Sequence, residues 1–181
     1  MAVLGGSIAR RYARAIFAIG VDKGNFEILG RQLADLAELW KESPVLRQTL
    51  ENPVFKLSQK RMVLQGLMPR IAPARQVQSL ALLLLERRRI AILPAVARAY
   101  EEMCDEKLGR VRARVISARP LDIASEAEIR KALEKRTGKK VLMTTAVDAD
   151  LIGGVVAHVA GVVLDGSVAS RLSALKTRLL N

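Results

Sequence analysis

Apolar residues recur every three or four positions through most of the first 106 residues, which is the pattern of amphipathic helices. Helix-breaking residues interrupt this pattern at short intervals, for example at Pro44, Asn52 and Pro69. Six helices joined by short loops are therefore predicted, and such helices usually pack as one bundle. The clearest of the six has a regular apolar stripe made of Phe26, Leu29, Leu33, Leu36 and Trp40.

Capping residues predict where several of these helices begin and end. Ser7 and Ser58 have side chains that can accept hydrogen bonds from the first free N–H groups of a helix, so the first and fourth helices are predicted to begin there. Pro69 is predicted to end the fourth helix, because a proline ring does not fit a helix interior. Pro94 is tolerated only in a first turn, which predicts the start of the sixth helix.

The pattern changes at Gly109. Arg110, Arg112 and Arg114 alternate with small apolar residues, and this period of two predicts a strand with one solvent-exposed face. The second part of the chain therefore contains β structure.

Further elements follow this strand. A helix is predicted to begin at Ser125, and a second strand is predicted over residues 141–147. Residues 155–164 are predicted to form a strand that bends at Gly161, and a last helix follows residue 167. Together these elements make a small α+β unit.

The fold class is thus predicted to be mainly α with a smaller α+β part: a six-helix bundle over residues 1–106, then a small strand and helix domain over residues 107–181. Half of the 181 residues are hydrophobic, which is enough to form cores and excludes extensive disorder. The formal net charge is +12. The first domain holds 16 basic and 11 acidic residues and the second holds 14 and 7, so the smaller domain carries the greater positive charge.

Few residues are suited to catalysis or metal binding. The single cysteine, Cys104, excludes an internal disulfide and lies on an apolar helical stripe, where we expect it to be buried. The single histidine, His158, excludes two-histidine metal sites, and its apolar strand indicates a structural role. Asp148, Asp150 and Asp165 lie near turns, where such side chains usually bond to the local backbone. We therefore expect no enzyme activity, no cofactor and no metal.

The segment from Thr137 to Lys140 is similar to a phosphate-binding loop. However, Leu133 stands where that loop needs its first glycine, and Lys140 stands where it needs Ser or Thr. The preferred interpretation is a helix end at Gly138.

No part of the sequence predicts a membrane span or a signal peptide. The longest nearly uncharged stretch, residues 151–164, is shorter than the roughly 20 apolar residues that a spanning helix needs. The basic, amphipathic N-terminus lacks the apolar region of a secretory signal and is predicted to belong to the folded domain.

Two kinds of binding function remain. The arginines of the basic strand and the run at residues 87–89 could neutralise nucleic-acid phosphates. The basic strand lacks the aromatic residues on which single-strand binders stack bases. Nucleic-acid binding is therefore not the preferred function, and the positive charge keeps it as the alternative.

The other function is binding of an amphipathic helix. The first helix, with Tyr12, Ile16 and Phe17, and the fifth, around residues 80–85, have apolar stripes wider than a bundle core requires. With small residues such as Ala13, two neighbouring helices could leave a groove for a partner helix. The same residues would serve equally well as bundle core.

Several segments, taken in order, resemble the delta subunit of the bacterial F-type ATP synthase, the counterpart of the mitochondrial oligomycin-sensitivity-conferring protein (OSCP). Each segment is short, but their order and spacing cover nearly the whole chain. They include residues 11–17 (Arg-Tyr-Ala-Arg-Ala-Ile-Phe), the pair at 52–53 (Asn-Pro), residues 137–139 (Thr-Gly-Lys), residues 151–154 (Leu-Ile-Gly-Gly) and residues 165–168 (Asp-Gly-Ser-Val).

The resemblance implies a non-catalytic stator subunit of the peripheral stalk, which joins the catalytic head to membrane-anchored b subunits so that proton-driven rotation is coupled to ATP synthesis. It implies that the bundle binds the N-terminal segment of an alpha subunit and that the C-terminal domain binds b or b-like stalk subunits. Association with the membrane would be indirect, on the cytoplasmic face of the bacterial inner membrane, and no nucleic acid is expected.

The resemblance also assigns candidate residues to the two surfaces. Those assigned to the alpha-subunit groove are Ala9, Tyr12, Ala13, Ile16, Phe17, Val77, Leu80, Ala81 and Leu84. Those assigned to the b-facing surface or to the C-terminal signature are Arg110, Arg112, Arg114, Asp148, Leu151, Gly153, Gly154, Asp165 and Ser167.

Overall fold

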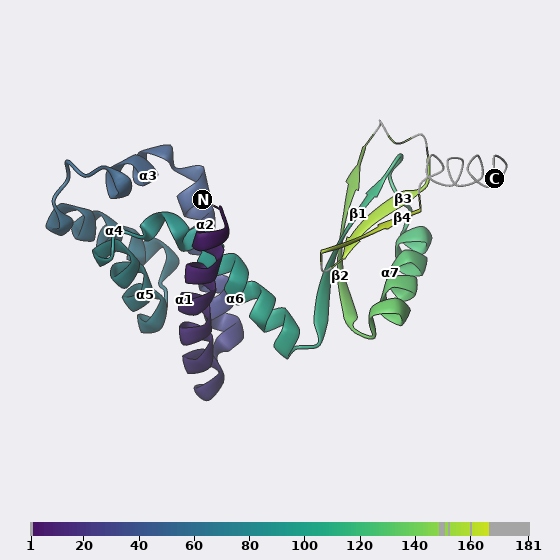
Figure 1. Cartoon of the computed structure of the whole chain (residues 1–181), viewed down its shortest axis with the longest axis horizontal. Coiled ribbons are helices and arrows are strands. Elements are labelled where there is room, and N and C mark those ends of the chain that lie inside the picture. Colours follow the sequence, from purple (N-terminus) through teal and green to yellow (C-terminus); the bar gives the residue numbers. More distant parts are fainter. Residues whose placement is uncertain (1, 149–150, 152, 160, 167–181) are drawn as a thin grey trace. The chain divides into compact units, whose positions relative to one another are not determined.

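The computed structural model describes residues 2–148, 151, 153–159 and 161–166, and it shows a mainly helical chain with a small four-stranded sheet (Figure 1). Its contacts divide into two compact units, Met1–Cys104 and Asp105–Asn181. The division lies two residues before the predicted end of the first domain, within helix α6 (Leu93–Lys107).

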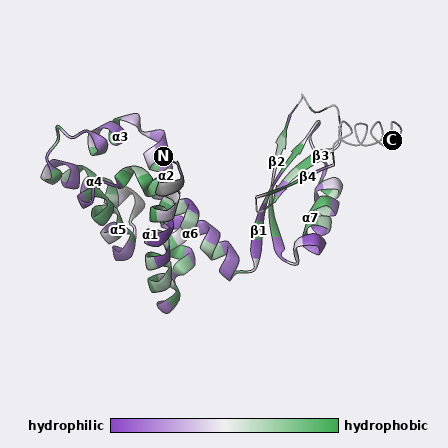
Figure 2. Ribbon diagram, viewed as in Figure 1, coloured by the Kyte–Doolittle hydropathy of each residue, from purple (hydrophilic) through white to green (hydrophobic). Residues whose placement is uncertain are grey.

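The first unit is helical, as predicted. Figure 2 shows hydrophobic and hydrophilic residues side by side on these helices, which is expected of amphipathic helices around a common core. The elements that precede α6 are α1 (Ala2–Asp22), α2 (Phe26–Glu42), α3 (Pro44–Glu51), α4 (Leu57–Ile71), α5 (Arg75–Glu86) and the 3₁₀ turn η1 (Ile90–Ile92).

Two of the predicted helix starts are wrong. Helix α1 begins at Ala2, five residues before Ser7. Helix α4 begins at Leu57 rather than at Ser58, because the Gln59 side chain accepts a hydrogen bond from the Lys56 N–H at 2.9 Å and closes the turn one residue earlier.

The predicted end of α4 is also wrong, because Pro69 lies inside the helix and the helix continues to Ile71. A proline near the end of a helix removes a hydrogen bond from the last turns only, so the chain tolerates it there. The helix ends where Ala72 adopts a left-handed conformation, with φ of 42°. Pro94, by contrast, lies in the first turn of α6 as predicted.

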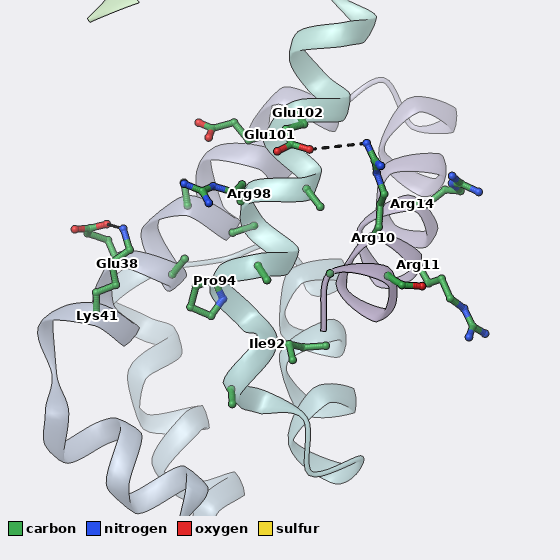
Figure 3. A pocket seen from close by; sticks show the side chains of 18 residues that line it. Arg10, Arg11, Arg14, Glu38, Lys41, Ile92, Pro94, Arg98, Glu101 and Glu102 are labelled. Atoms are coloured by element: carbon green, nitrogen blue, oxygen red, sulfur yellow. Dashed lines mark hydrogen bonds and ion pairs between the residues drawn. The ribbon is translucent and has the colours of Figure 1, made fainter. Parts of the chain in front are cut away.

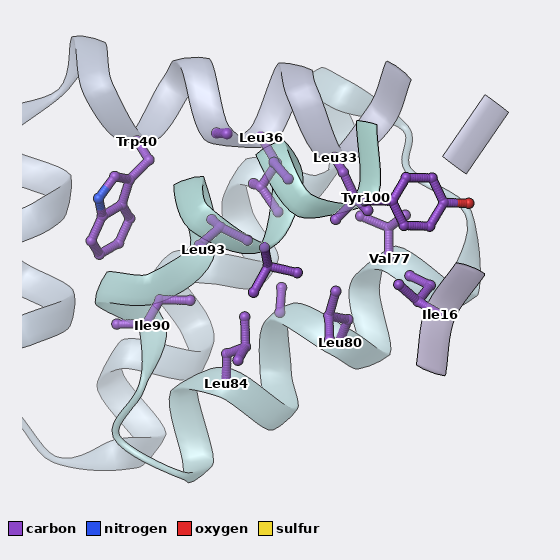
Figure 4. Packing of buried hydrophobic residues seen from close by; sticks show 14 of the residues in the cluster. Ile16, Leu33, Leu36, Trp40, Val77, Leu80, Leu84, Ile90, Leu93 and Tyr100 are labelled. Carbon is purple, nitrogen blue, oxygen red and sulfur yellow. The ribbon is translucent and has the colours of Figure 1, made fainter. Parts of the chain in front are cut away.

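Tyr100 is among the largest wholly buried side chains in the core of the first unit (Figure 4). Its hydroxyl donates a hydrogen bond to the Phe26 carbonyl at 2.9 Å, and burial raises the pKa of this hydroxyl, so the proton is retained. The Phe17 ring meets the Tyr100 ring edge-on at 5.5 Å between centroids. A Cβ atom at Gly20 would lie 2.9 Å from the Tyr100 hydroxyl, so this close approach of α1 requires glycine. Cys104 is buried in the same cluster, as predicted.

The second unit contains a four-stranded sheet of order β2-β1-β3-β4. Strands β1 and β2 are parallel and are connected through α7, whereas β1–β3 and β3–β4 are antiparallel. The elements are β1 (Arg110–Ser117), α7 (Ile123–Thr137), β2 (Lys140–Val147), β3 (Val155–Val159) and β4 (Val162–Asp165).

Two details of this unit differ from the prediction. The segment predicted as one strand bent at Gly161 forms the separate strands β3 and β4, because Gly161 adopts a φ of 81° that reverses the chain. Helix α7 is capped by Asp122, whose carboxylate accepts the Ser125 N–H at 2.7 Å, so Ser125 is the donor to the cap and not the cap itself. The predicted last helix lies outside the described residues.

The two faces of the sheet differ in burial among the described residues. One face of β1 is apolar and buried, with Val111, Ala113 and Val115 in a cluster with Leu133 of α7. Helix α7 therefore covers this face of the sheet (Figure 1). The residues of β1 between these three point to the other face, so the predicted alternation along β1 is confirmed.

Candidate docking surfaces

The described residues contain no cluster of the side chains that usually bind metal ions. Among them, no His, Cys, Asp and Glu residues form a group of three or more that could hold a metal ion. None of the described helices is long and apolar enough to cross a membrane. The segment similar to a phosphate loop is a helix end, in which Gly138 caps α7 with φ of 65°. The surfaces that remain are suited to binding.

An apolar groove of about 520 Å³ lies between α1 and α5. Ile16 and Leu80 are nearly buried at its base, 4% and 7% exposed. Ile19 of α1 and Leu83 of α5 also line it, yet 45% and 39% of these side chains are exposed. Large apolar side chains exposed on two adjacent helices are typical of a surface that a partner covers.

Of the nine predicted groove residues, three line the groove and six do not. Tyr12, Ile16 and Leu80 line the groove. The half-buried Phe17 packs on the aromatic rings of the core instead. The other five are buried in the core and do not line the groove: Ala9, Ala13, Val77, Ala81 and Leu84.

Other residues that line the groove were not among the nine candidates, although Leu83 belongs to the apolar run 80–85 that the sequence indicated: Ala15, Ile19, Lys23, Arg75, Gln76, Ser79 and Leu83. Positions 12, 15, 16 and 19 on α1, continued by 23 just after it, and 76, 79, 80 and 83 on α5 repeat with helical spacing. They form a second stripe beside the buried one, and Ile16 and Leu80 belong to both stripes. Figure 4 shows these two residues among the buried ones. The sequence could have indicated the other groove residues through one feature, which is a stripe of mixed apolar and polar residues next to the apolar stripe of the core.

The charges around the groove have one sign. Lys23 and Arg75, both exposed, line it together, and no acidic residue is among the described residues that line it. On α1, Tyr12 lies eleven residues before Lys23, and its hydroxyl accepts a hydrogen bond from the Arg89 guanidinium at 3.4 Å. Because Arg89 follows α5 and Arg75 begins it, the two helices run in opposite directions along the groove.

A second, wider hollow of about 1360 Å³ lies between α1, α2 and α6 (Figure 3). Its charged residues include both signs: Arg10 lies 4.0 Å from Glu102, and Lys41 lies 3.0 Å from Glu38. Much of its remaining lining is alanine. Oppositely charged neighbours and small side chains make this hollow less suited to an apolar helix than the α1/α5 groove.

The face of the sheet opposite α7 carries several basic residues, and we call it the basic face. Arg112 and Arg114 are exposed on it, and the strand pairing places His158 opposite Arg114 and Lys140 opposite Arg110. His158 is therefore exposed beside a cation, although its apolar strand indicated a structural role.

Arg112 also has a structural contact on this face. Its Nε lies 2.5 Å from the carboxylate of Asp105, which is only 8% exposed. The ion pair joins the last turn of α6 to β1. A buried carboxylate needs such a partner, so Arg112 stabilises the fold as well as contributing charge to the surface.

The remaining predicted C-terminal residues lie at turns around the sheet. Asp148 follows β2 and donates its N–H to the Ser117 carbonyl at 2.9 Å. Leu151, Gly153 and Gly154 lie between β2 and β3, and Gly154 has φ of 83°. Asp165 ends β4 opposite Val156. Ser167 lies outside the described residues.

Known proteins resemble the chain along nearly its full length. The family model of the ATP synthase delta (OSCP) subunit matches residues 8–179. The ATP synthase subunit delta of Anaeromyxobacter dehalogenans strain 2CP-1 is 42% identical over 177 residues, which cover 98% of this chain and 99% of that protein. The subunit delta of Geobacter sp. strain M21 is 37% identical over 170 residues, 94% of each chain.

A solved structure has the same fold. It is a chain of the Toxoplasma gondii mitochondrial ATP synthase hexamer, similar with a TM-score of 0.74 at 28% identity, over 96% of this chain and 97% of that one. The fold and the sequence therefore agree. The chain belongs to the ATP synthase delta (OSCP) subunit family, whose members are non-catalytic stator subunits of the peripheral stalk.

Proposed function

We propose that the groove between α1 and α5 binds the N-terminal segment of an alpha subunit as an amphipathic helix, and so attaches the chain to the catalytic head. The observation that carries this proposal is the exposure of Ile19 and Leu83 beside the nearly buried Ile16 and Leu80. A partner helix with apolar residues three and four positions apart would cover all four side chains.

In this proposal the six helices of the first unit act as one bundle that holds the two walls of the groove at a fixed spacing. Ala13 and Ala81 are wholly buried, and such small residues let neighbouring helices approach closely. Phe17, whose ring contacts Phe26 and Tyr100, anchors α1 to this core. A groove formed in advance loses little entropy when a partner is bound.

The basic face of the sheet is the proposed surface for the b or b-like stalk subunits. Arg110, Arg114, Lys140 and His158 share this face, and it would attract acidic helices. Because the b subunits are anchored in the membrane, the chain would reach the cytoplasmic face of the bacterial inner membrane through protein contacts only.

A chain that holds both partners would keep the head from turning with the rotor, so that proton-driven rotation is coupled to ATP synthesis. Connecting the two partners also raises the effective concentration of each at its own site. This suits a joint that has to resist torque.

The test of the groove is a calorimetric titration of the full chain with a synthetic peptide of the alpha-subunit N-terminal segment. We expect saturable binding of one peptide, weakened at least about tenfold by Ile19→Asp, because a carboxylate would be buried against apolar side chains. The control is Met62→Asp on α4, which replaces a side chain that is 64% exposed outside the groove. Equal loss in both variants, or no binding by the unmodified chain, would refute the proposal.

A further inference from the structure

Two of the residues that line the groove between α1 and α5 are cations, Lys23 and Arg75, and Arg89, which donates a hydrogen bond to Tyr12, is a third cation beside it. Lys23 follows the last residue of α1, and Arg75 is the first residue of α5. Because the two helices are antiparallel, these residues meet at the same end of the groove. Tyr12 marks the other end, about 16 Å away along α1 at 1.5 Å per residue.

The groove contains little that could neutralise these two cations. Asp22 precedes Lys23 in the sequence, but it does not line the groove. The polar residues nearest in sequence to Arg75 that line it are Gln76 and Ser79, which are uncharged. The favourable partner for this end of the groove is therefore an acidic side chain of the bound segment.

An apolar groove alone does not fix the position of a helix within it. If an amphipathic helix slides by three or four residues, about one turn or 5.4 Å, its apolar stripe still faces the groove. The alternative positions then differ little in buried apolar area. A single charged contact at one end distinguishes them, because only one position brings the acidic side chain to the cations.

We propose that Lys23 and Arg75 determine the register of the helix bound in the α1/α5 groove by pairing with an acidic residue near one end of that helix. This inference rests on the proposed function, since it assigns a specificity role within the same groove. The apolar residues supply most of the affinity, and the two cations select one position.

The first test is a double-mutant cycle with the full chain and the alpha-subunit N-terminal peptide. Each of Lys23→Ala and Arg75→Ala is expected to weaken binding about threefold, and both together about tenfold, which is the range for exposed ion pairs. The losses should shrink at high salt. The matched control is Arg31→Ala, which removes an exposed cation of α2 that does not line the groove.

Peptide variants identify the acidic partner. Each Asp or Glu of the peptide is replaced by Asn or Gln, and one replacement should weaken binding of the unmodified chain but not of the double variant. If no acidic position couples to Lys23 or Arg75, the inference is wrong.

The second test measures register directly. A cysteine is introduced at Ser79, which is exposed in the groove, and is cross-linked to peptides that carry a cysteine at successive positions. The only native cysteine, Cys104, is buried. We expect one strong peptide position with the unmodified cations, and two or more positions about one turn apart in the double variant.

The outcomes separate the two proposals. If the peptide does not bind the unmodified chain, the proposed function fails. If it binds, but the double variant keeps both the affinity and the single cross-linking position, only the register inference fails.

Discussion

The two proposed docking surfaces differ in how they are constructed. The α1/α5 groove lies on a packed helical core, and its exposed residues Ile19 and Leu83 are not part of the buried cluster. The basic face of the sheet includes Arg112, which also compensates a buried carboxylate. Substitutions in the groove should therefore change binding alone, whereas substitutions on the basic face can change binding and stability together.

The largest expected effect separates the two surfaces. The double substitution of Ile19→Asp and Leu83→Asp should weaken binding of the alpha-subunit peptide at least about 100-fold, because two charges would be placed against apolar side chains. Binding of a soluble b-subunit fragment should not change. Both affinities can be measured by titration calorimetry on the same protein preparation. An equal loss of b binding would mean that the surfaces are not independent.

The next largest effect concerns the contribution of Arg112, on the basic face, to the stability of the folded chain. Replacement of Arg112 by Ala leaves Asp105 buried without that partner, and we expect it to lower the free energy of unfolding by about 2 kcal/mol. Denaturant unfolding of the full chain, followed by circular dichroism, measures this change. The combined change of Asp105→Asn and Arg112→Ala should recover part of the loss. No recovery would show that Arg112 stabilises the sheet in another way.

Binding by the basic face is better tested away from Arg112. The double substitution of Arg110→Gln and Arg114→Gln should weaken binding of the b-subunit fragment about tenfold at low salt and less at high salt. Binding of the alpha-subunit peptide should remain the same. Arg130→Gln, on the exposed side of α7, is the matched control. An effect that does not depend on salt would argue against an electrostatic contact.

The sequence predicted the parts of this molecule that depend on local periodicity. The helical pattern of the first unit and the alternation along β1 are both in the structure, because burial of one face repeats with the period of the element. The end of α4 and the β3–β4 hairpin were not predicted. A proline or a glycine permits several local conformations, and tertiary contacts select among them.

The residues of the candidate groove also could not be predicted fully from local periodicity. Consecutive helical residues are about 100° apart, so the pattern of α1 and α5 identifies an apolar side without saying where the core stops and the surface begins. Ala13 and Ala81 proved to be core, whereas Ile19 and Leu83 are exposed in the groove. The contact of Arg112 with Asp105 depends on the arrangement of the end of α6 and β1, and no local sequence pattern predicts that arrangement.

The smallest expected effect concerns the cap of α7, which supports the covered face of the sheet. Hydrogen bonds from Ser125 lower the pKa of the Asp122 carboxyl in the folded chain below its usual value of 3.8. The ionised cap therefore stabilises the fold above that value, and the stabilisation is lost as the pH falls through the lowered pKa. We expect Asp122→Ala to lower the unfolding temperature slightly at pH 7 and to have a smaller effect near pH 2. Thermal unfolding at the two pH values measures the difference, with Glu128→Ala on the same helix as the control. A loss of equal size at both pH values would mean that the carboxylate charge does not act through the cap.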